Sequence, residues 1–405
     1  MLKILKYLVM YFELKWDDMS VIVLCVDSVE RYWFFLRIYR ALKNDYKIII
    51  LTTEPMVKLL AVLAGLRSKL ITEHVVECVG EDEYIGNSIE IINGQFSYEQ
   101  GRVYFRSIVS ALKKLNGCQK IVVWNGQHLF GRAVQYCEMN FECHSQYLEL
   151  ANFSGRIFSD PMGVNANSSI AKFPDILDGY DDVTEEFHEQ WLGEYRLSKL
   201  QPIPQSKQSN LKRALSVSNM LMKRFYPSVN RLSLNSLASK RVHVSAPDIQ
   251  SSSIPDQYIF LPLQVSGDTQ IRLHSSVDNL DAIDIAASMA ADAGLSLVVK
   301  IHPAEYSELH IADVVEKIKS CGAVISALNT TDLIQGSVLV VTINSTVGLE
   351  AMILGKSVKV LGRALYNDFD QHRLRKYLHG YLVSGVDYFS DEPISFSVAK
   401  RVVGL

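Results

Sequence analysis

The stretch Val340-Val341-Thr342-Ile343-Asn344-Ser345-Thr346-Val347-Gly348-Leu349-Glu350 decides the fold class. An apolar run ends in a cluster of small polar residues, and a helical pattern starts at once, which predicts a buried strand leading into a helix. Unpaired backbone N–H groups and the positive end of the helix dipole meet at such a helix N-terminus. They favour an anion there, such as a nucleotide phosphate. The alternative is an ordinary N-cap, since Asn and Ser cap many helices.

The same alternation of strands and helices runs through both ends of the chain, which predicts parallel sheets covered by helices. We therefore predict an α/β protein with two Rossmann-like domains facing a cleft, and with ligands at the carboxyl ends of the strands. The predicted strands are 21–26, 47–52, 74–79, 120–124 and 145–150, then 258–265, 295–301, 323–326, 338–343 and 358–361. The predicted helices are 30–43, 56–66, 100–115 and 131–139, then 280–293, 312–320 and 346–354.

Length and composition agree with two domains. The chain has 405 residues, of which 48% are hydrophobic and 21% charged, values typical of a globular protein too long for one core. Six scattered cysteines without a CxxC pair favour a reduced, cytoplasmic protein, and we predict no transmembrane segment and no secretory signal. The predicted parts are an N-terminal extension of uncertain status at 1–18, a first domain at 19–170, a basic helical, membrane-proximal linker at 171–255, and a second domain at 256–405.

The linker has a lopsided charge. Residues 195–247 contain no Asp or Glu but ten lysines and arginines, although the whole chain has a net charge of −3. A basic segment in a slightly acidic protein predicts attraction to an anionic surface such as lipid head groups, an acidic glycan or nucleic acid. Nucleic acid is disfavoured because no recognised binding motif accompanies the charge. The alternative is an ordinary solvated helix face.

Three residues that follow strands are candidates for chemistry. His302 lies in Lys300-Ile301-His302-Pro303 after an apolar strand, where imidazole can donate to a phosphate or act as a general acid. Asp268 lies in the polar loop after the strand that ends at Val265, and it can be a nucleophile, a base or an N-cap. Glu149 ends the strand at 145–150. A structural histidine and a turn or cap aspartate are the alternatives.

Other motifs are weaker or absent. The turn-rich loop 160–169 offers amides and hydroxyls that can bind a sugar, or it is simply a structured connection between domains. The sequence contains no GxxxxGK[ST], no GxGxxG after the first strand, no HExxH and no spaced Cys/His set. We therefore predict no metal site.

Five short segments taken in order carry a resemblance. They are Asp160-Pro161-x-Gly163-Val164-Asn165-x-x-Ser168, Gln264-x-x-x-Asp268-x-Gln270-Ile271 with His274-Ser275-Ser276, Lys300-x-His302-Pro303, Thr342-Ile343-Asn344-Ser345-Thr346-x-Gly348, and Gly362-x-Ala364-Leu365-Tyr366. Together they resemble the bacterial capsule polysaccharide synthesis family, which includes the β-Kdo glycosyltransferases of group 2 capsule export systems. The segments at 264–276 and 342–348 look most like the members that place the first Kdo on a phospholipid.

This resemblance implies a GT-B-like fold with the acceptor on the first domain and the donor, CMP-Kdo, on the second. It implies retention of configuration, which by double displacement needs a carboxylate at the anomeric centre, and Asp268 is the candidate. His302 would assist the departure of CMP without a metal or other cofactor, and Glu149 would be the acid/base for the acceptor hydroxyl. The residues predicted to bind the donor are Lys300, His302, Asn344, Ser345, Thr346 and Glu350. The residues predicted to bind substrate are Asp160, Asn165, Gln264, Gln270, His274 and Ser275.

The sequence thus predicts a glycosyltransferase that adds Kdo to a lipid or glycan acceptor during capsule polysaccharide synthesis. It is expected to work in the cytoplasm, peripherally at the inner membrane near anionic lipid, with capsule assembly or export proteins as further candidate partners. One alternative is transfer of another sugar, from CMP-sialic acid or a UDP-sugar, to a surface polysaccharide. The other is a non-catalytic component of capsule export.

Overall fold

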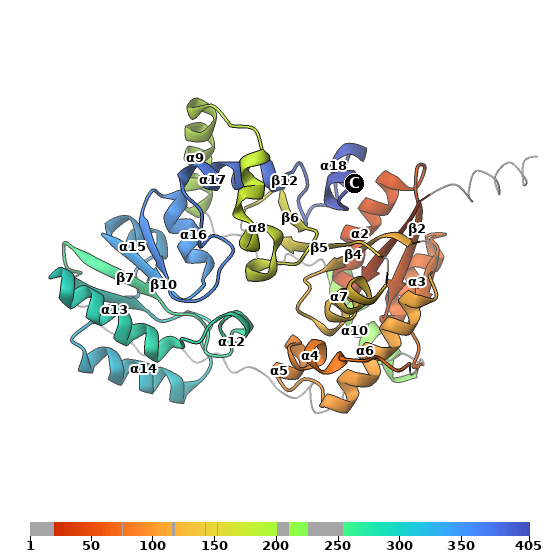
Figure 1. The fold of residues 1–405 in the computed structure, drawn as a ribbon, viewed down its shortest axis with the longest axis horizontal. Coiled ribbons are helices and arrows are strands. Elements are labelled where there is room, and N and C mark those ends of the chain that lie inside the picture. The colour runs from red at the N-terminus through yellow and green to blue at the C-terminus, as the bar shows by residue number, and fades with distance from the viewer. Residues whose placement is uncertain are drawn as a thin grey trace, which may run out of the picture. The chain divides into compact units, whose positions relative to one another are not determined.

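Two α/β units make up the computed structural model (Figure 1). The structure describes residues 20–74, 76–115, 118–141, 143–151, 153–200, 210–225 and 254–405. The predicted extension at 1–18 and the linker stretches at 201–209 and 226–253 lie outside these residues. Unit 1 is drawn from Met1–Val164, Pro204–Leu237 and Leu382–Leu405, and unit 2 from Asn165–Ile203 and Ala238–Tyr381.

Unit 1 is built on a sheet with the strand order β12-β6-β5-β4-β1-β2-β3. Strands β1 to β5 run parallel to one another, as the predicted alternation of strands and helices requires. Its strands are β1 (Val21–Val26), β2 (Lys47–Thr52), β3 (Ser68–Leu70), β4 (Cys118–Trp124), β5 (Ser145–Leu150), β6 (Arg156–Asp160) and β12 (Val383–Ser384). Its helices are α2 (Val29–Leu42), α3 (Pro55–Leu63), α4 (Glu81–Gly86), α5 (Ile89–Ile92), α6 (Tyr98–Lys113), α7 (Leu129–Asn140), α10 (Asn210–Phe225) and α18 (Phe396–Val402).

Two predictions for unit 1 are wrong. The strand expected at 74–79 is absent from its described residues, and the short β3 pairs with β2 instead. The sheet is also not wholly parallel, because β6 pairs antiparallel with β5 and β12 antiparallel with β6. The connection between β5 and β6 is too short for the crossover that a parallel pair requires, so the chain turns back as a hairpin.

The C-terminal return to unit 1 was not predicted, and side chains hold it there. Arg37 of α2 is buried and donates to the carbonyl oxygens of Asp387 (2.7 Å) and Glu392 (2.6 Å). The Ser159 hydroxyl donates to the Val402 carbonyl at 2.8 Å. Because a buried guanidinium needs several acceptors, these bonds fix the last part of the chain against α2.

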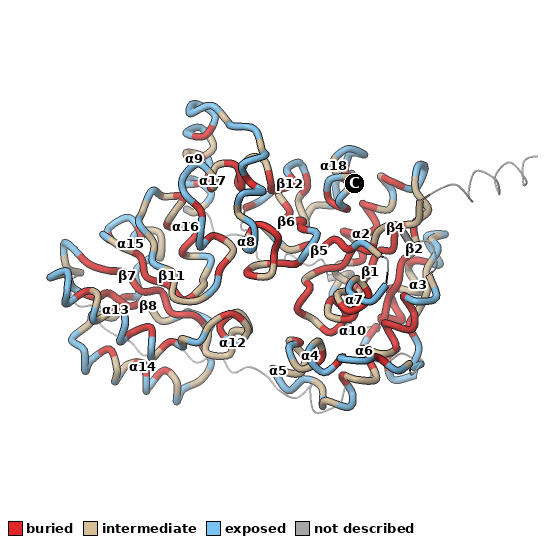
Figure 2. The backbone as a smooth tube through the Cα atoms, viewed as in Figure 1, coloured by how far each residue is buried: buried red, intermediate tan, exposed pale blue. Residues whose placement is uncertain are grey.

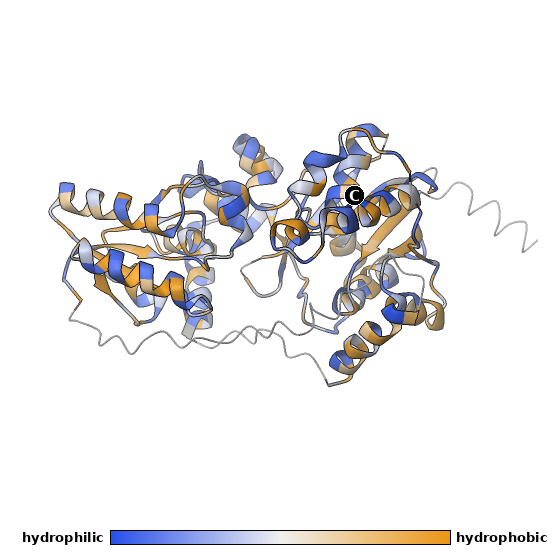
Figure 3. Cartoon of the chain, turned by 90° about the horizontal axis from the view of Figure 1, so that it is seen from below, coloured by the Kyte–Doolittle hydropathy of each residue, from blue (hydrophilic) through white to orange (hydrophobic). Residues whose placement is uncertain are grey.

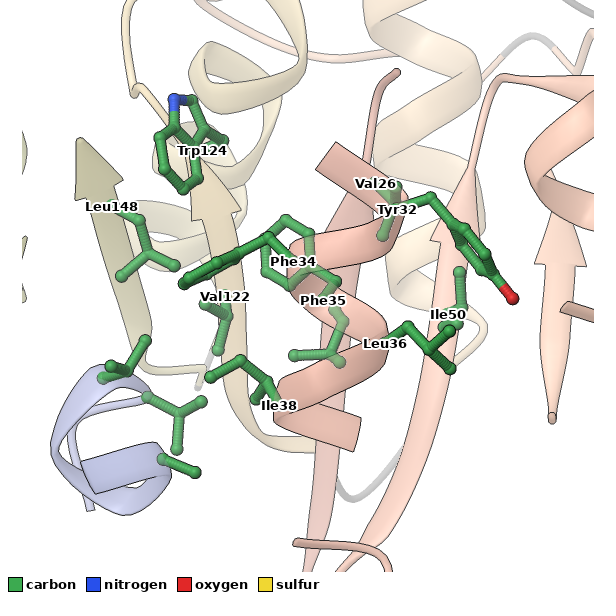
Figure 4. Close-up of a cluster of buried hydrophobic side chains, with 14 of the residues drawn as sticks. Val26, Tyr32, Phe34, Phe35, Leu36, Ile38, Ile50, Val122, Trp124 and Leu148 are labelled. Atoms are coloured by element: carbon green, nitrogen blue, oxygen red, sulfur yellow. The ribbon is translucent and has the colours of Figure 1, made fainter. Parts of the chain in front are cut away.

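The main core of unit 1 lies between the sheet and α2. Phe34, Phe35 and Ile38 of α2 pack over Val122 and Leu148 of the adjacent strands, and all five are almost completely buried (Figure 4). Each such side chain contributes roughly 1.5–3 kcal/mol by leaving water. Buried residues lie on all sides of α2, because α10 and α18 also contact this helix.

Unit 2 is built on a parallel sheet with the order β11-β10-β7-β8-β9. The central strands of this sheet are coloured red for buried in Figure 2 and orange for hydrophobic in Figure 3. Its strands are β7 (Tyr258–Pro262), β8 (Ser296–Lys300), β9 (Val324–Ile325), β10 (Leu339–Thr342) and β11 (Ser357–Val360). Its α-helices are α8 (Ser169–Lys172), α9 (Glu185–Leu200), α12 (Thr269–His274), α13 (Asn279–Ala293), α14 (Glu308–Ser320), α15 (Thr330–Gly336), α16 (Thr346–Ile353) and α17 (Gln371–Lys376). Its other helical turns are the 3₁₀ segments η1 (Asn165–Asn167) and η2 (Pro174–Gly179) and the π-helical segment η3 (Tyr377–Tyr381).

The predicted fold class is therefore confirmed: both units are α/β and built around parallel strands. Within the described residues, no helix combines the length and the hydropathy needed to cross a membrane.

A buried ion pair docks α10 on α3. The Lys223 ammonium lies 2.7 Å from Oε2 of Glu54, and both side chains are nearly inaccessible. Asn219, one turn earlier, donates to the same carboxylate and accepts the Met56 N–H at 3.0 Å. A buried carboxylate is tolerated only with such partners, so this cluster fixes the position of α10 on unit 1.

Replacing Lys223 should therefore destabilise unit 1. Lys223→Met leaves the Glu54 charge buried without its cation, and we expect the free energy of unfolding to fall by about 3–5 kcal/mol. Thermal unfolding followed by circular dichroism measures the change. Arg224→Met is the matched control, because Arg224 is the exposed neighbour. Equal melting temperatures for both variants would show that the pair is not an anchor.

Candidate functional site

The side chain of Gln264 joins two loops of unit 2. Its Nε2 donates to Oδ2 of Asp268 and to Oδ1 of Asn344, both at 3.0 Å, and its Oε1 accepts the Asn344 N–H at 3.2 Å. The Asn344 amide donates in turn to the Gln270 carbonyl at 2.9 Å. The loops after β7 and β10 are thus held together by one buried amide.

The strand order explains why these loops meet. After β7 the chain adds β8 and β9 on one side, and then returns to place β10 on the other side of β7. The space between the carboxyl ends of β7 and β10 is therefore the topological switch point, where open α/β sheets bind their ligands. Gln264 and Asn344 lie directly after these two strands.

Asp268 has the capping role that the sequence allowed. It is the N-cap of α12, and its Oδ1 accepts the Gln270 N–H at 2.9 Å. Asp268 is partly exposed, and its Oδ2 accepts a hydrogen bond from the Gln264 side-chain amide. A cap does not exclude reactivity, because the same bonds fix the direction of the carboxylate.

His302 follows β8 and is exposed. Desolvation by the surrounding atoms lowers its pKa, Lys300 acts in the same direction, and the charges of Asp268 and Glu305 oppose them. The ring is therefore neutral at neutral pH. Because Nδ1 accepts the Ala304 N–H at 3.0 Å, Nε2 carries the proton and can donate it to a ligand oxygen.

Glu305 is a site residue that the sequence reasoning missed. It is buried and accepts N–H bonds from Ser266 (2.6 Å), Tyr306 (2.9 Å) and Ser307 (3.0 Å). Burial acts to raise its pKa, but these N–H groups outweigh burial and lower it. An acid three residues after His302 was the available signal, and Glu305 fixes the His302 loop to the loop that carries Asp268.

The start of α16 carries the N-cap that the sequence offered as an alternative to an anion site. Ser345 caps the helix by accepting the Val347 N–H at 3.2 Å, and Thr346 is exposed. Gly348 is required because a Cβ atom there would lie 2.2 Å from the hydroxyl of the buried Tyr366, which also donates to the Ser345 carbonyl. The motif ending in Tyr366 thus packs against the start of this helix.

The remaining predicted residues of unit 2 have structural partners. Glu350 is paired with Lys199 of α9 at 2.7 Å, and Lys300 donates to the Leu328 carbonyl at 2.5 Å. His274 is buried beside Arg363, whose guanidinium lies 3.2 Å from its Nδ1. Ser275 accepts the Val277 N–H at 2.9 Å. Contacts of these residues with a donor stay predictions.

The loop at 160–169 is organised by its own polar groups. Asp160 is completely buried, and its Oδ1 accepts the N–H groups of Met162 (2.7 Å) and Gly163 (3.0 Å). Asn165 has a positive φ of 53°, and its carbonyl accepts the Ser168 hydroxyl at 2.7 Å. These bonds favour a role in loop shape over direct contact with substrate.

Unit 1 carries a second polar cluster at the same topological position. The chain adds β2 and β3 on one side of β1 and then returns to place β4 on the other. Arg31, after β1, is paired with Asp27, and His128, after β4, lies 3.1 Å from Glu90. This is the switch point of the second sheet, so charged groups gather where a ligand is expected.

Glu149 lies at the end of β5 beside this cluster. Its Oε2 accepts from the Asn125 amide at 2.7 Å, and its Oε1 accepts the Leu150 N–H at 3.0 Å. Burial raises the pKa of Glu149, while Leu150, Arg31, Asn125 and His128 oppose the rise. A carboxylate with a raised pKa is a stronger base than an ordinary glutamate. It lies in unit 1, whereas Asp268 and His302 lie in unit 2.

Asn125 is the second residue missed by the sequence reasoning. Its φ of 49° is unusual for a residue other than glycine, and its Oδ1 accepts the Gln127 N–H at 2.9 Å. The turn closes tightly on α7, since a Cβ atom on Gly131 would lie 2.6 Å from the Gly126 Cα. Asn125 therefore directs its amide at Glu149 from a rigid turn.

Comparisons with known proteins identify a family whose profile matches the part of the chain that carries the unit 2 cluster. Residues 217–370 match the profile of the family described as capsule polysaccharide biosynthesis protein. Protein FixF of Sinorhizobium fredii is 37% identical over 114 residues, which cover 27% of this chain and 27% of FixF. The capsule polysaccharide export protein KpsS of Escherichia coli is 32% identical over 126 residues, which cover 29% of this chain and 32% of KpsS. The matches thus span about a third or less of these relatives.

Among solved structures, the KpsC β-Kdo 2,7 transferase of Thermosulfurimonas dismutans aligns with 95% of this chain and 98% of that one, at 16% identity and a TM-score of 0.44. The resemblance to the capsule polysaccharide synthesis family is confirmed over residues 217–370, which contain four of the five motif segments, whereas the segment at 160–168 lies outside the match.

Removing the Gln264 amide should loosen the unit 2 site. Gln264→Met has a similar volume but leaves the Asn344 N–H and one Asp268 oxygen without their partner, and each unsatisfied group costs about 1–3 kcal/mol. We expect a lower melting temperature for this variant, measured by calorimetry. Gln371→Met, at an exposed glutamine of the same unit, is the control. A Gln264→Met protein as stable as the control would contradict the bridging role.

Removing the Asn125 amide should raise the pKa of Glu149 further, because this hydrogen bond stabilises the charged carboxylate. Asn125→Gly keeps the positive φ without strain, so it isolates the effect of the amide. An NMR titration of protein carrying ¹³C-labelled glutamate measures the shift, and Asn140→Gly on α7 should leave the Glu149 titration unchanged. A Glu149 pKa that stays constant or falls in Asn125→Gly would refute this account.

Proposed function

Because residues 217–370 match the capsule polysaccharide biosynthesis family, we propose that the protein is a glycosyltransferase of capsule synthesis. We propose CMP-Kdo as its donor, a lipid or glycan hydroxyl as its acceptor, and transfer with retention of configuration. One observation carries the proposal. Motif segments far apart in the sequence join around Gln264 at a topological switch point, where hydrogen bonds direct the Asp268 carboxylate and the charge of Asp268 acts on the neutral His302 imidazole.

The donor half-reaction uses the groups of unit 2. The Asp268 carboxylate attacks the anomeric carbon of Kdo, and the bond to the phosphate oxygen breaks, so that CMP leaves with the electron pair. The proton on Nε2 of His302 and the N–H groups at the start of α16 stabilise the charge on the departing phosphate. No proton has to be supplied to CMP, because a phosphate monoester is a good leaving group.

The acceptor half-reaction needs a base. In the proposal, the Glu149 carboxylate takes the proton of the acceptor hydroxyl while its oxygen attacks the anomeric carbon, and the bond to Asp268 breaks. Two inversions give net retention. The raised pKa of Glu149 makes it a stronger base than an ordinary glutamate. The mechanism needs no metal, which stays a prediction.

The place where the protein works depends on which acceptor it uses. A lipid acceptor would require the protein to work at the surface of the inner membrane on its cytoplasmic side. A glycan acceptor would allow transfer away from the membrane, in contact with capsule assembly or export proteins.

Transfer is tested by incubating the purified protein with CMP-Kdo and phosphatidylglycerol or lysophosphatidylglycerol, with and without EDTA. Release of CMP and the product mass are measured. We expect a Kdo adduct that is insensitive to EDTA. CMP-sialic acid and UDP-sugars are the competing donors. Tight CMP binding without transfer from any donor would favour a non-catalytic export component.

The role of Asp268 is tested against a second capping aspartate. Asp268→Asn should lower transfer by about 10³-fold or more while leaving CMP affinity nearly unchanged, because nucleophile and leaving group are different parts of the site. Asp278→Asn is the matched control, since Asp278 is the exposed N-cap of α13. Equal activity in the two variants would show that Asp268 acts only as the N-cap of α12.

A further inference from the structure

Helix α10 is held on unit 1 by only one of its faces. Asn219 and Lys223 contact Glu54, and Leu215 and Met222 pack against the core of unit 1. Lys212, on the same side, is paired with Asp391 at 3.0 Å. These residues recur every three or four positions, as one face of a helix requires.

The opposite face of α10 is apolar and exposed. Leu211 is 65% exposed, Val217 55%, Leu221 64% and Phe225 82%, and Ala214 between them is exposed as well. Their spacing of three, three, four and four residues forms one continuous stripe along the 16-residue helix. Single exposed apolar residues are common, but a row of five along one helix marks an interaction surface.

The charge beside this apolar stripe is positive only. Arg213 precedes Val217 by one helical turn and Arg224 follows Leu221 by three residues, so both border the stripe, and both are exposed. The sequence has no acidic residue from 195 to 247, so no carboxylate of this segment opposes them. A protein partner would normally present mixed polar groups, whereas an apolar stripe bordered by cations fits an anionic lipid surface.

We propose that α10 docks the protein on an anionic lipid bilayer, with Val217, Leu221 and Phe225 among the acyl chains and Arg213 and Arg224 at the head groups. The buried Glu54–Lys223 pair transmits this attachment to unit 1 as a rigid connection. The docking depends on no step of sugar transfer, so it goes beyond the proposed function.

Vesicle co-sedimentation of the full chain tests the proposal, without any sugar nucleotide present. The vesicles contain phosphatidylcholine alone or with phosphatidylserine, which supplies negative charge without being the acceptor of the transfer assay. We expect binding to the anionic vesicles that weakens as salt is raised. Arg213→Gln/Arg224→Gln should lower the partition coefficient about 25-fold, since each cation near an anionic surface contributes a factor of roughly five. Leu221→Gln/Phe225→Gln should lower it about tenfold or more at every salt concentration.

Matched controls separate the stripe from general effects. Lys43→Gln/Lys319→Gln changes the net charge by the same amount at exposed sites elsewhere, and Leu309→Gln/Leu328→Gln removes two exposed leucines of unit 2. Both should bind vesicles like the original protein. All variants are at exposed positions, and their melting temperatures verify folding.

Three results would overturn the proposal. The original protein could fail to bind anionic vesicles, or the α10 variants could bind as well as the controls. Light scattering could also show a dimer that Leu221→Gln/Phe225→Gln converts to a monomer, in which case a second copy covers the stripe. Because transfer is measured in a separate assay by CMP release and product mass, loss of vesicle binding and loss of activity are distinguishable.

Discussion

The buried amide of Gln264 is the constraint on which the unit 2 site depends. Its two N–H groups and its oxygen are all used, on Asp268 and on both the side chain and the backbone of Asn344. Asn279 satisfies its backbone as well, accepting the Gln264 N–H at 3.3 Å and donating to the Gln264 carbonyl at 2.8 Å. A residue with no free hydrogen-bonding group cannot move alone, so the loops after β7 and β10 form one rigid edge.

The two switch points of this chain have different electrostatics. In unit 2 the groups are amides, hydroxyls, a neutral histidine, the partly exposed Asp268 and the buried Glu305, whose carboxylate is held by backbone N–H groups. In unit 1 the cluster consists of paired charges, Arg31 with Asp27 and His128 with Glu90, next to a carboxyl group whose pKa is raised by burial. The Asn125 amide and the Leu150 N–H hold the Glu149 carboxylate, while the nearby Arg31 and His128 oppose the rise in its pKa.

Much of the fold could be predicted because the strands are short, buried and apolar. The predicted strands at 21–26, 47–52 and 145–150 coincide with β1, β2 and β5. The hairpin partner β6 could not be found this way, because three of its five residues (Arg156, Ser159 and Asp160) are polar although the strand is largely buried. The site was predicted as a set of loops at strand ends, but not as a network. Gln264 and Asn344 are 80 residues apart, and nothing local in the sequence indicates that an amide joins them.

Helix α10 shows that basic residues close together in a sequence can have different structural roles. The sequence treats Lys212, Arg213, Lys223 and Arg224 alike, yet two of them lie on the face packed against unit 1 and two lie on the exposed face. Lys223 is needed where a compact ammonium can approach a buried carboxylate, and the arginines stand where a charged head can stay hydrated. The helical period, which separates neighbours by 100°, divides the charges between these roles. Net charge therefore predicts attraction to an anionic surface only after the buried cations have been subtracted.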